Sequence, residues 1–286
     1  MIGSNFGRLL KLHGNDVTLA GRTPPPSGTA LASFPFLVGD YTKGDFTETV
    51  VAPFSAIVFA AGNDIRHLPK GSDQDEFRRT TQIEGVPNFV SIAKRAGVRR
   101  FVQIGSYYHQ VMPHLIKTHP YIRARHLADE GARVLATRDF NVSTLNAPSI
   151  VSAERYQTFI HWAKGERPDV PYFAPPGGTN YMSLRSLSEA IWGAVKNAQS
   201  GKAYLIGDEN LTFRAFFQKI FDALKNPNKL EERNEEHPLL PDALISPGRG
   251  TILAYEPDPV ETALLGYHRG DIDRAITELA TTGNAS

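Results

Sequence analysis

Short apolar runs alternate with helical stripes in the first half of the chain. The runs at 17–21, 34–38, 56–62, 100–106 and 141–148 are rich in Val, Ile, Phe and Thr, and several are apolar at nearly every position. Strands buried on both faces of a sheet have this character. Apolar residues three and four apart lie between some of these runs, so the pattern predicts an α/β fold of βαβ units with a mainly parallel sheet.

The second half of the chain has a looser pattern. The stretch 165–180 is dense in Pro and Gly, which predicts a long surface loop. Aromatic and aliphatic residues at helical spacing over 213–224 predict an amphipathic helix that faces the core. The charged stretch 226–238 is expected to be solvated, and a last helix is expected around 272–279.

Composition narrows the class of protein. The chain has 286 residues, 41% apolar and 21% charged, as globular proteins have. A net charge of +1 does not indicate a nucleic-acid partner, and the absence of cysteine excludes disulfides and thiolate metal sites. No apolar run approaches the roughly 20 residues of a membrane span, and the N-terminus lacks the apolar core of a signal peptide. We therefore expect a cytoplasmic protein with no membrane or nucleic-acid partner.

Residues around the first two strands are candidates for a dinucleotide site. Gly3 begins a helix, and a helix that follows a glycine-rich loop faces the pyrophosphate in dinucleotide-binding folds. Arg22 ends the first run, where an acid would bind the 2′-hydroxyl of NAD and a basic residue suits the 2′-phosphate of NADP. This favours NADP, although Arg22 is equally well explained as a surface arginine. Asp40 follows the next run, where it can reach the adenine edge or cap a turn.

Candidate acid–base residues follow the fourth run. Ser106 ends that strand, and ligands of parallel sheets bind at the carboxyl ends of strands. Tyr121 and Arg125 stand four residues apart, so both lie on one face of a helix. A nearby cation lowers the pKa of a phenol and makes it a better proton carrier near neutral pH. The spacing alone is uninformative, because Tyr181 and Arg185 share it, but only Tyr121 follows a strand that ends in a serine.

Three histidines lie between these residues. His109, His114 and His119 have a spacing of five, which fits no helical pair of metal ligands. We therefore expect them in a loop beside the substrate, and we expect no metal.

In order along the chain, these segments resemble the extended short-chain dehydrogenase/reductase family, the NAD(P)-dependent epimerase/dehydratase group. IGSNFGRLLKLHGNDVTLAGR is similar to the end of the family's glycine loop with its first helix and second strand. TQIEGVPNFVSIAKRAGVRRFVQIGS resembles the pattern N-x-x-G-T…A…GV-x-R-F-V-x-x-S-S, and YIRARHLADEGARVL resembles the Tyr-x-x-x-Lys helix. The resemblance runs over most of the chain, and the ordered series is more specific than any one motif.

The resemblance implies a doubly wound, Rossmann-like sheet in a dinucleotide-binding domain at 1–150 and a smaller substrate-side lobe at 151–286. Elements at about 181–208 are expected to pack back on the first domain. Ser106 and Tyr121 take the serine and proton-donor roles, and Arg125 takes the lysine position. The implied cofactor contacts are Gly3, Arg22, Asp40, Ala60, Ala61, Gly62 and Gln82, and the implied substrate-pocket residues are Tyr107, Tyr108, Asn146 and Pro148.

Four departures from the family pattern bear on activity. Arg125 stands where the family has lysine, and it cannot release a proton at neutral pH. Gln82 stands at the family's asparagine, and Asn146 stands at an arginine expected beside a diphosphate sugar. The first strand and two loop glycines have no counterpart. Because that strand is central, its neighbours would leave backbone groups unpaired at about 1–3 kcal/mol each. We therefore expect about ten further residues upstream, the alternative being a shortened relative without cofactor.

Two classes of function stay open. The first is an enzyme that binds NADP or NAD and moves a hydride to or from a carbinol or carbonyl carbon of a small molecule, as a reductase, an epimerase or a dehydratase does. The second is a non-catalytic NAD(P)-binding sensor or scaffold, which the departures favour. The resemblance also implies a homodimer, formed through a bundle of the helices at about 76–96 and 119–137.

Overall fold

The structure, a computed structural model, describes residues 1–62, 68 and 70–282. The chain forms two compact units. The first comprises residues 1–146, 188–205 and 260–266, and the second comprises residues 147–187, 206–259 and the chain from 267.

A four-stranded sheet in the order β3-β4-β5-β9 forms the centre of the first unit. β3 runs parallel to β4, and β5 runs parallel to β9. Six of the seven residues of β4 are buried, which explains why this run shows no alternation of polar and apolar positions. The strands are β3 (Ala56–Phe59), β4 (Arg100–Ser106), β5 (Asn141–Ala147) and β9 (Ala203–Leu205).

A second, two-stranded sheet lies in the same unit. β1 (Leu19–Gly21) pairs in parallel with β2 (Phe36–Val38). Within the described residues, these two strands share no ladder with the four-stranded sheet. The β1–β2 pair is therefore held to the unit by side chains and loops alone.

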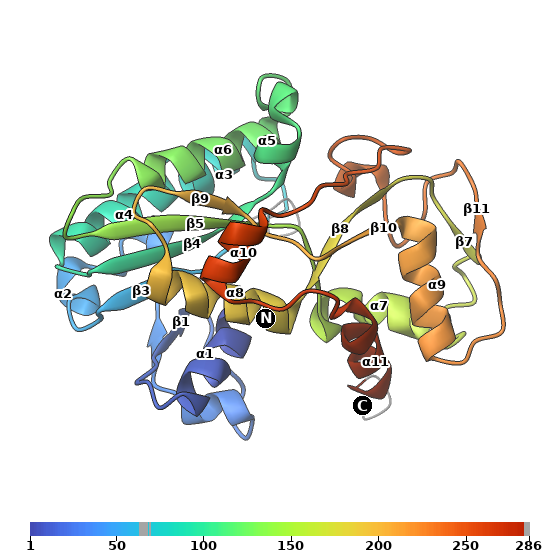
Figure 1. Ribbon diagram of the computed structural model, residues 1–286, viewed down its shortest axis with the longest axis horizontal. Helices are drawn as coiled ribbons and strands as arrows, with labels where there is room; N and C mark the ends of the chain where they lie inside the picture. The colour runs from blue at the N-terminus through green and yellow to red at the C-terminus, as the bar shows by residue number, and fades with distance from the viewer. Residues whose placement is uncertain (63–67, 69, 283–286) are drawn as a thin grey trace. The chain divides into compact units, whose positions relative to one another are not determined.

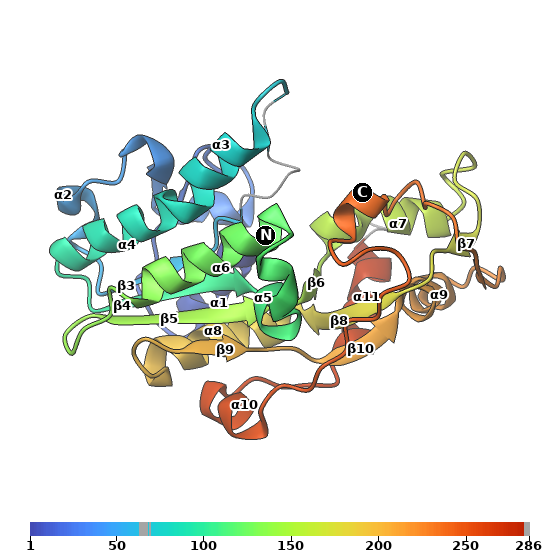
Figure 2. The same ribbon diagram turned by 90° about the horizontal axis from the view of Figure 1, so that it is seen from above.

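Helices cover both faces of the four-stranded sheet, with α4 and α6 over one face and α1 and α8 on the other (Figure 1). Figure 2 shows α4 and α6 side by side. Val86, Phe89 and Val90 of α4 pack with Phe59 and Phe101 of the sheet in one buried cluster. The predicted α/β fold with a mainly parallel sheet is confirmed. The helices are α1 (Ile2–Leu12), α3 (Gln74–Arg78), α4 (Gly85–Arg95), α6 (Pro120–Arg133) and α8 (Leu184–Asn197).

The second unit has its own sheet and an aromatic core. The sheet order is β10-β8-β6, with β6 parallel and β10 antiparallel to β8. The predicted core-facing helix is confirmed as α9, whose phenylalanines are buried beside Trp162. The elements are β6 (Ser149–Val151), α7 (Ala153–Ala163), β7 (Phe173–Ala174), β8 (Gly178–Ser183), β10 (Glu209–Thr212), α9 (Phe213–Ala223), β11 (Glu231–Glu232) and α11 (Ile272–Thr282).

Two predictions for this unit hold only in part. The stretch 165–180 is a loop with mostly exposed residues as far as Tyr172, but it is largely buried from Phe173 through β7 and into β8. Its glycines serve close packing, since a Cβ on Gly178 would stand 2.5 Å from the Leu211 carbonyl oxygen of the neighbouring strand. The charged stretch 226–238 is solvated over its exposed residues 231–236, but Leu230 and His237 are buried within it.

Shorter elements complete the chain. They are α2 (Glu48–Val51), α5 (Tyr108–Val111) and α10 (Pro259–Leu265), a π-helical turn at Arg79–Ile83, and 3-10 turns at Ala30–Ser33, Tyr41–Lys43, Pro113–Ile116 and Asp242–Leu244. In the part of the chain that the structure describes, no helix has both the length and the apolar character needed to cross a bilayer.

Candidate active site

The carboxyl end of β4 carries the candidate serine. Ser106 is the last residue of the strand and is 5% exposed. Tyr107 and Tyr108 follow directly and begin α5, with their ring centroids 4.4 Å apart. Tyr107 is buried and Tyr108 is half-buried. The strand therefore delivers one hydroxyl and two phenols to the same end of the sheet.

The candidate tyrosine lies in the first turn of α6. Pro120 starts this helix, where its fixed φ suits the first helical position. The Tyr121 ring meets the Tyr108 ring edge-on, with centroids 6.2 Å apart. One turn later, Arg125 Nη2 donates a hydrogen bond of 2.9 Å to the carbonyl oxygen of Ile104 in β4. This bond fixes the turn that carries Tyr121 against the strand that ends at Ser106.

Arg125 has a second hydrogen bond inside the protein. Its Nη1 donates to Gln82 Oε1 at 3.2 Å, and Gln82 is 1% exposed in the π-helical turn. The structure thus brings together two residues that the sequence assigns to different roles, one to catalysis and one to the cofactor.

Arg22 and Asp40 also come together, at the ends of β1 and β2. Asp40 caps the turn at Tyr41–Lys43 by accepting from the Thr42 backbone N–H at 3.0 Å. Burial alone would raise the pKa of Asp40, but the bonds from Thr42 and the charges of Arg22 and Lys43 outweigh it and lower this pKa. Asp40 is therefore a turn cap that also faces Arg22.

The small residues predicted to meet a cofactor lie in open surroundings. Ala60, Ala61 and Gly62 follow β3 at its carboxyl end, and Ala61 and Gly62 are exposed. Among the described atoms, nothing lies within 4 Å of where a Cβ on Gly3 or Gly62 would stand. A ligand can therefore approach the backbone closely at both glycines.

The predicted pocket residues Asn146 and Pro148 are buried. Asn146 Nδ2 donates to Gln110 Oε1 at 2.8 Å and to Asp129 Oδ2 at 3.3 Å. The amide nitrogen of Asn146 is thus engaged inside the first unit. Its role as a substrate contact stays a prediction.

Asp129 is the centre of a buried network that the sequence analysis does not predict. The carboxylate is fully buried and pairs with His109 Nε2 at 3.0 Å and with Arg133 Nε at 2.6 Å. Burial alone would raise the pKa of Asp129, but the hydrogen bonds from His109 and Arg133 hold it far below its usual range. His109 is therefore a hydrogen-bond partner of Asp129 on α5 rather than a loop residue. The Asp129–Arg133 spacing on a predicted helix was the available signal.

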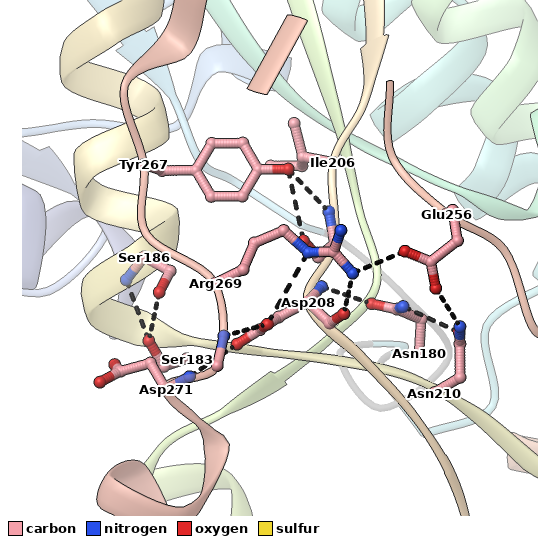
Figure 3. Close-up of polar contacts among 12 residues, drawn as sticks. Asn180, Ser183, Ser186, Ile206, Asp208, Asn210, Glu256, Tyr267, Arg269 and Asp271 are labelled. Carbon is pink, nitrogen blue, oxygen red and sulfur yellow. Dashed lines mark hydrogen bonds and ion pairs between the residues drawn. The ribbon is translucent and has the colours of Figure 1, made fainter. Parts of the chain in front are cut away.

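A second polar cluster lies in the second unit (Figure 3). Asp208, 2% exposed, accepts from the backbone N–H groups of Gly270 at 2.5 Å and Asp271 at 3.0 Å. Figure 3 shows the Arg269 guanidinium between the Asp208 backbone and Glu256, to which it donates at 2.7 and 2.8 Å. The polar groups of this cluster bind one another, and these hydrogen bonds join Asp208, just before β10, to residues 269–271, just before α11. Over the described ranges, no three His, Asp or Glu side chains are placed to hold a metal ion.

A family model matches more than half of the chain. The model describes the NAD dependent epimerase/dehydratase family and covers residues 1–162, which include Ser106, Tyr121 and Arg125. The chain belongs to this family. The resemblance to the epimerase/dehydratase group that the sequence predicts is thereby confirmed.

Solved structures share the fold of this family member over nearly its whole length. UDP-N-acetylglucosamine 4-epimerase from Bacillus cereus is 13% identical with a TM-score of 0.71, covering 99% of this chain and 96% of its own. WbmH of Bordetella bronchiseptica, in complex with NAD+, is 15% identical with a TM-score of 0.71 over 96% and 92%. A short-chain dehydrogenase/reductase superfamily protein from Agrobacterium tumefaciens with bound NAD is 16% identical with a TM-score of 0.67 over 100% and 94%.

Identities this low establish the Rossmann-type fold alone. No curated protein matches the sequence significantly.

The residues of this epimerase/dehydratase family member fit a dinucleotide at the positions that the structure describes. Gly3 and Gly62 leave room for close approach, and Arg22 offers a cation. The buried guanidinium of Arg125 adds a second cation, whose Nε has no hydrogen-bond partner among the described residues.

Proposed function

We propose that the chain is an NAD(P)-dependent enzyme that oxidises or reduces a small-molecule carbon bearing a hydroxyl or carbonyl group. Tyr121 is the proposed proton donor and acceptor, and Ser106 orients the substrate oxygen. The observation that carries the proposal is the 2.9 Å hydrogen bond from Arg125 to the Ile104 carbonyl. It holds the helical turn of Tyr121 against the strand end of Ser106.

The bound dinucleotide would supply or accept the hydride. The protein's own groups handle the proton. The Tyr121 hydroxyl gives a proton to a carbonyl oxygen that is being reduced, or takes one from a hydroxyl that is being oxidised. Ser106 donates a hydrogen bond to the same oxygen. Arg125 fixes the turn that carries Tyr121 and does not carry the proton itself.

Asn146 bears on whether the substrate contains a diphosphate. One solved relative is a UDP-N-acetylglucosamine 4-epimerase, which makes a sugar nucleotide a candidate. Asn146, however, replaces the arginine expected beside a diphosphate, and its amide nitrogen is held by Gln110 and Asp129. We therefore favour a hydroxyl or carbonyl compound without a diphosphate.

The choice between NAD and NADP turns on Arg22. Its charge suits a 2′-phosphate, but Asp40 interacts with it electrostatically and would repel that phosphate. The solved relatives from B. bronchiseptica and A. tumefaciens hold NAD. We propose that the chain binds either dinucleotide, with the preference of Arg22 for NADP weakened by Asp40.

Cofactor titration followed by turnover assays tests the proposal. NADH and NADPH are titrated by nicotinamide fluorescence, and oxidation is then followed on a panel of carbonyl compounds and sugar nucleotides. Tyr121→Phe should lower turnover at least about 100-fold while leaving cofactor affinity unchanged, since it removes only the proton carrier. Tyr172→Phe, which deletes a phenol oxygen in the second unit, is the matched control and should retain turnover.

A non-catalytic sensor is the second candidate, because a guanidinium in place of an amine removes one proton carrier. Tight binding of a dinucleotide with no turnover of any substrate would support it. Binding of neither dinucleotide would refute both functions. A homodimer through α4 and α6 stays a prediction, which light scattering on the eluted protein would test.

A further inference from the structure

The segment between α3 and α4 contains one turn that is wider than an α-helical turn. Residues Arg79–Ile83 form a π-helical turn between α3 and α4. A Cβ on Gly85 would stand 2.2 Å from the Thr80 carbonyl oxygen, so the wide turn requires glycine at that position. The π-helix occurs mostly as single turns inside α-helices, frequently at functional sites. Here the turn carries Gln82, which is 1% exposed.

Arg125 is a buried cation that has no carboxylate partner among the described residues. It is 7% exposed, and its hydrogen bonds go to the neutral oxygens of Gln82 and Ile104. Among the residues that the structure describes, no carboxylate forms an ion pair with it. Burying an uncompensated charge is costly, so a purely structural arginine is expected to have an acidic partner.

Helix α6, which carries Arg125, also contains an arginine that does have an acidic partner. Two turns further along α6, Arg133 pairs with the buried carboxylate of Asp129 at 2.6 Å. The negative charge of Asp129 neutralises the positive charge of Arg133. Arg125 is fixed by two hydrogen bonds as well, but its positive charge is not cancelled. The difference lies in the partner, which is an amide at Gln82 and a carboxylate at Asp129.

We propose that Gln82 is a positioning residue, which fixes the Arg125 guanidinium beside β4 without neutralising it, so that its charge remains available to a bound dinucleotide. The inference rests on the proposed function. Under this proposal the two departures from the family pattern, glutamine at 82 and arginine at 125, belong together, because each side chain binds the other. The planar guanidinium provides one N–H for Ile104 and another for the side chain of Gln82. Gln82 then supports the cation and has no need to touch the cofactor.

Two substitutions of Gln82 distinguish the effect of losing the position of the Arg125 guanidinium from the effect of neutralising its charge. Gln82→Met keeps the volume and removes the acceptor, whereas Gln82→Glu keeps the acceptor and adds a charge that cancels the guanidinium. Both are compared with wild type by urea unfolding and by NADH and NADPH titration. Gln82→Met should lower stability and weaken dinucleotide binding. Gln82→Glu should keep or raise stability and yet weaken binding at least tenfold, which a merely structural contact would not do.

The matched control is Gln103→Met. Gln103 is also 1% exposed and lies in β4, but its Oε1 has no partner among the described residues. This variant should bind NADH as wild type does. The cycle Gln82→Met, Arg125→Met and the double variant should be strongly non-additive in unfolding, while Gln103→Met with Arg125→Met should be additive.

The outcomes are distinguishable. Additive unfolding effects of Gln82→Met and Arg125→Met would overturn the pairing, whatever the binding data show. Wild-type affinity in Gln82→Glu would overturn the charge role and leave the proposed function standing. Failure of the wild-type protein to bind either dinucleotide would refute the proposed function and the positioning role together.

Discussion

Two aspartates, one in each unit, are almost completely buried, but their carboxylates have different kinds of hydrogen-bond partners. Asp129 is paired with the side chains of His109 and Arg133. Asp208 accepts instead from the backbone N–H groups of Gly270 and Asp271. Side-chain partners can be substituted together with the acid, whereas backbone donors remain after any substitution. The first arrangement thus joins two helices, and the second fixes the path of the chain before α11.

Asp129→Ala should have the largest effect, a loss of about 4 kcal/mol of unfolding free energy, because it leaves the His109 ring and the Arg133 guanidinium without the buried carboxylate that they share. Adding Arg133→Met should recover part of that loss, since it removes the guanidinium that Asp129→Ala leaves unpaired. Urea unfolding of the two single variants and the double variant measures both effects. A double variant that is as unstable as the sum of the single variants would contradict the view that side chains alone satisfy this acid.

Asp208→Asn should lower the unfolding free energy by about 2–3 kcal/mol, because one backbone N–H then faces an amide NH2 instead of an acceptor. Adding Arg269→Met should increase the loss and recover nothing, since the donors of Gly270 and Asp271 remain. Recovery in that double variant would remove the distinction between the two acids.

Acidification should weaken the second unit before it affects Asp129. His237 is fully buried among the rings of Phe159, Trp162, Phe173 and Phe217, and burial lowers its pKa from 6.5 to about 4. The unfolded chain therefore binds the proton first, and stability falls as pH drops from about 6.5 to 4, by up to about 3 kcal/mol.

Asp129 has a lowered pKa, so its contribution is lost only below the usual range near 3.8. Unfolding free energies at pH 7, 5.5 and 4.5 test this order. His237 Nδ1 accepts from the Leu239 N–H at 3.1 Å, and His237→Asn can keep that acceptor. The variant should lose most of the pH dependence above 4.5, the remainder coming from His119, whose pKa is also lowered by burial, and a wild-type slope in the variant would place the titration elsewhere.

Arg269→Met alone should have the smallest effect, about 0.5–1 kcal/mol, because its partner Glu256 is 69% exposed and water replaces that contact. Thermal unfolding of this variant beside Arg133→Met should show the larger loss for Arg133. Equal losses would mean that burial of the acid does not set the strength of these pairs.

Much of the first unit is predictable from its sequence. The run at 100–106 is β4 residue for residue, because a short, mainly apolar run that is buried on both faces has few alternatives. The positions of Ser106 and Tyr121, at a strand end and in a first helical turn, follow from the same pattern. The contact of Gln82 with Arg125 does not, since it joins residues 43 apart through a turn that is wider than the helical period.

The second unit is less predictable for a related reason. Proline and glycine usually indicate loops, but at 173–180 they allow strands to approach closely in a buried sheet. His237 lies in a charged stretch, and its burial depends on aromatic rings from α7, β7 and α9. Local composition carries no information about such distant neighbours.

The separate β1–β2 pair has a consequence for local unfolding. A ladder of two short strands is only marginally stable by itself, and cooperativity with the larger sheet must pass through side chains. Amide hydrogen exchange should therefore be fastest in these strands among the sheets of the first unit. Arg22 and Asp40 lie at the ends of the same strands, so a ligand that contacts both would slow that exchange and bind more tightly to a protein in which this pair is already ordered.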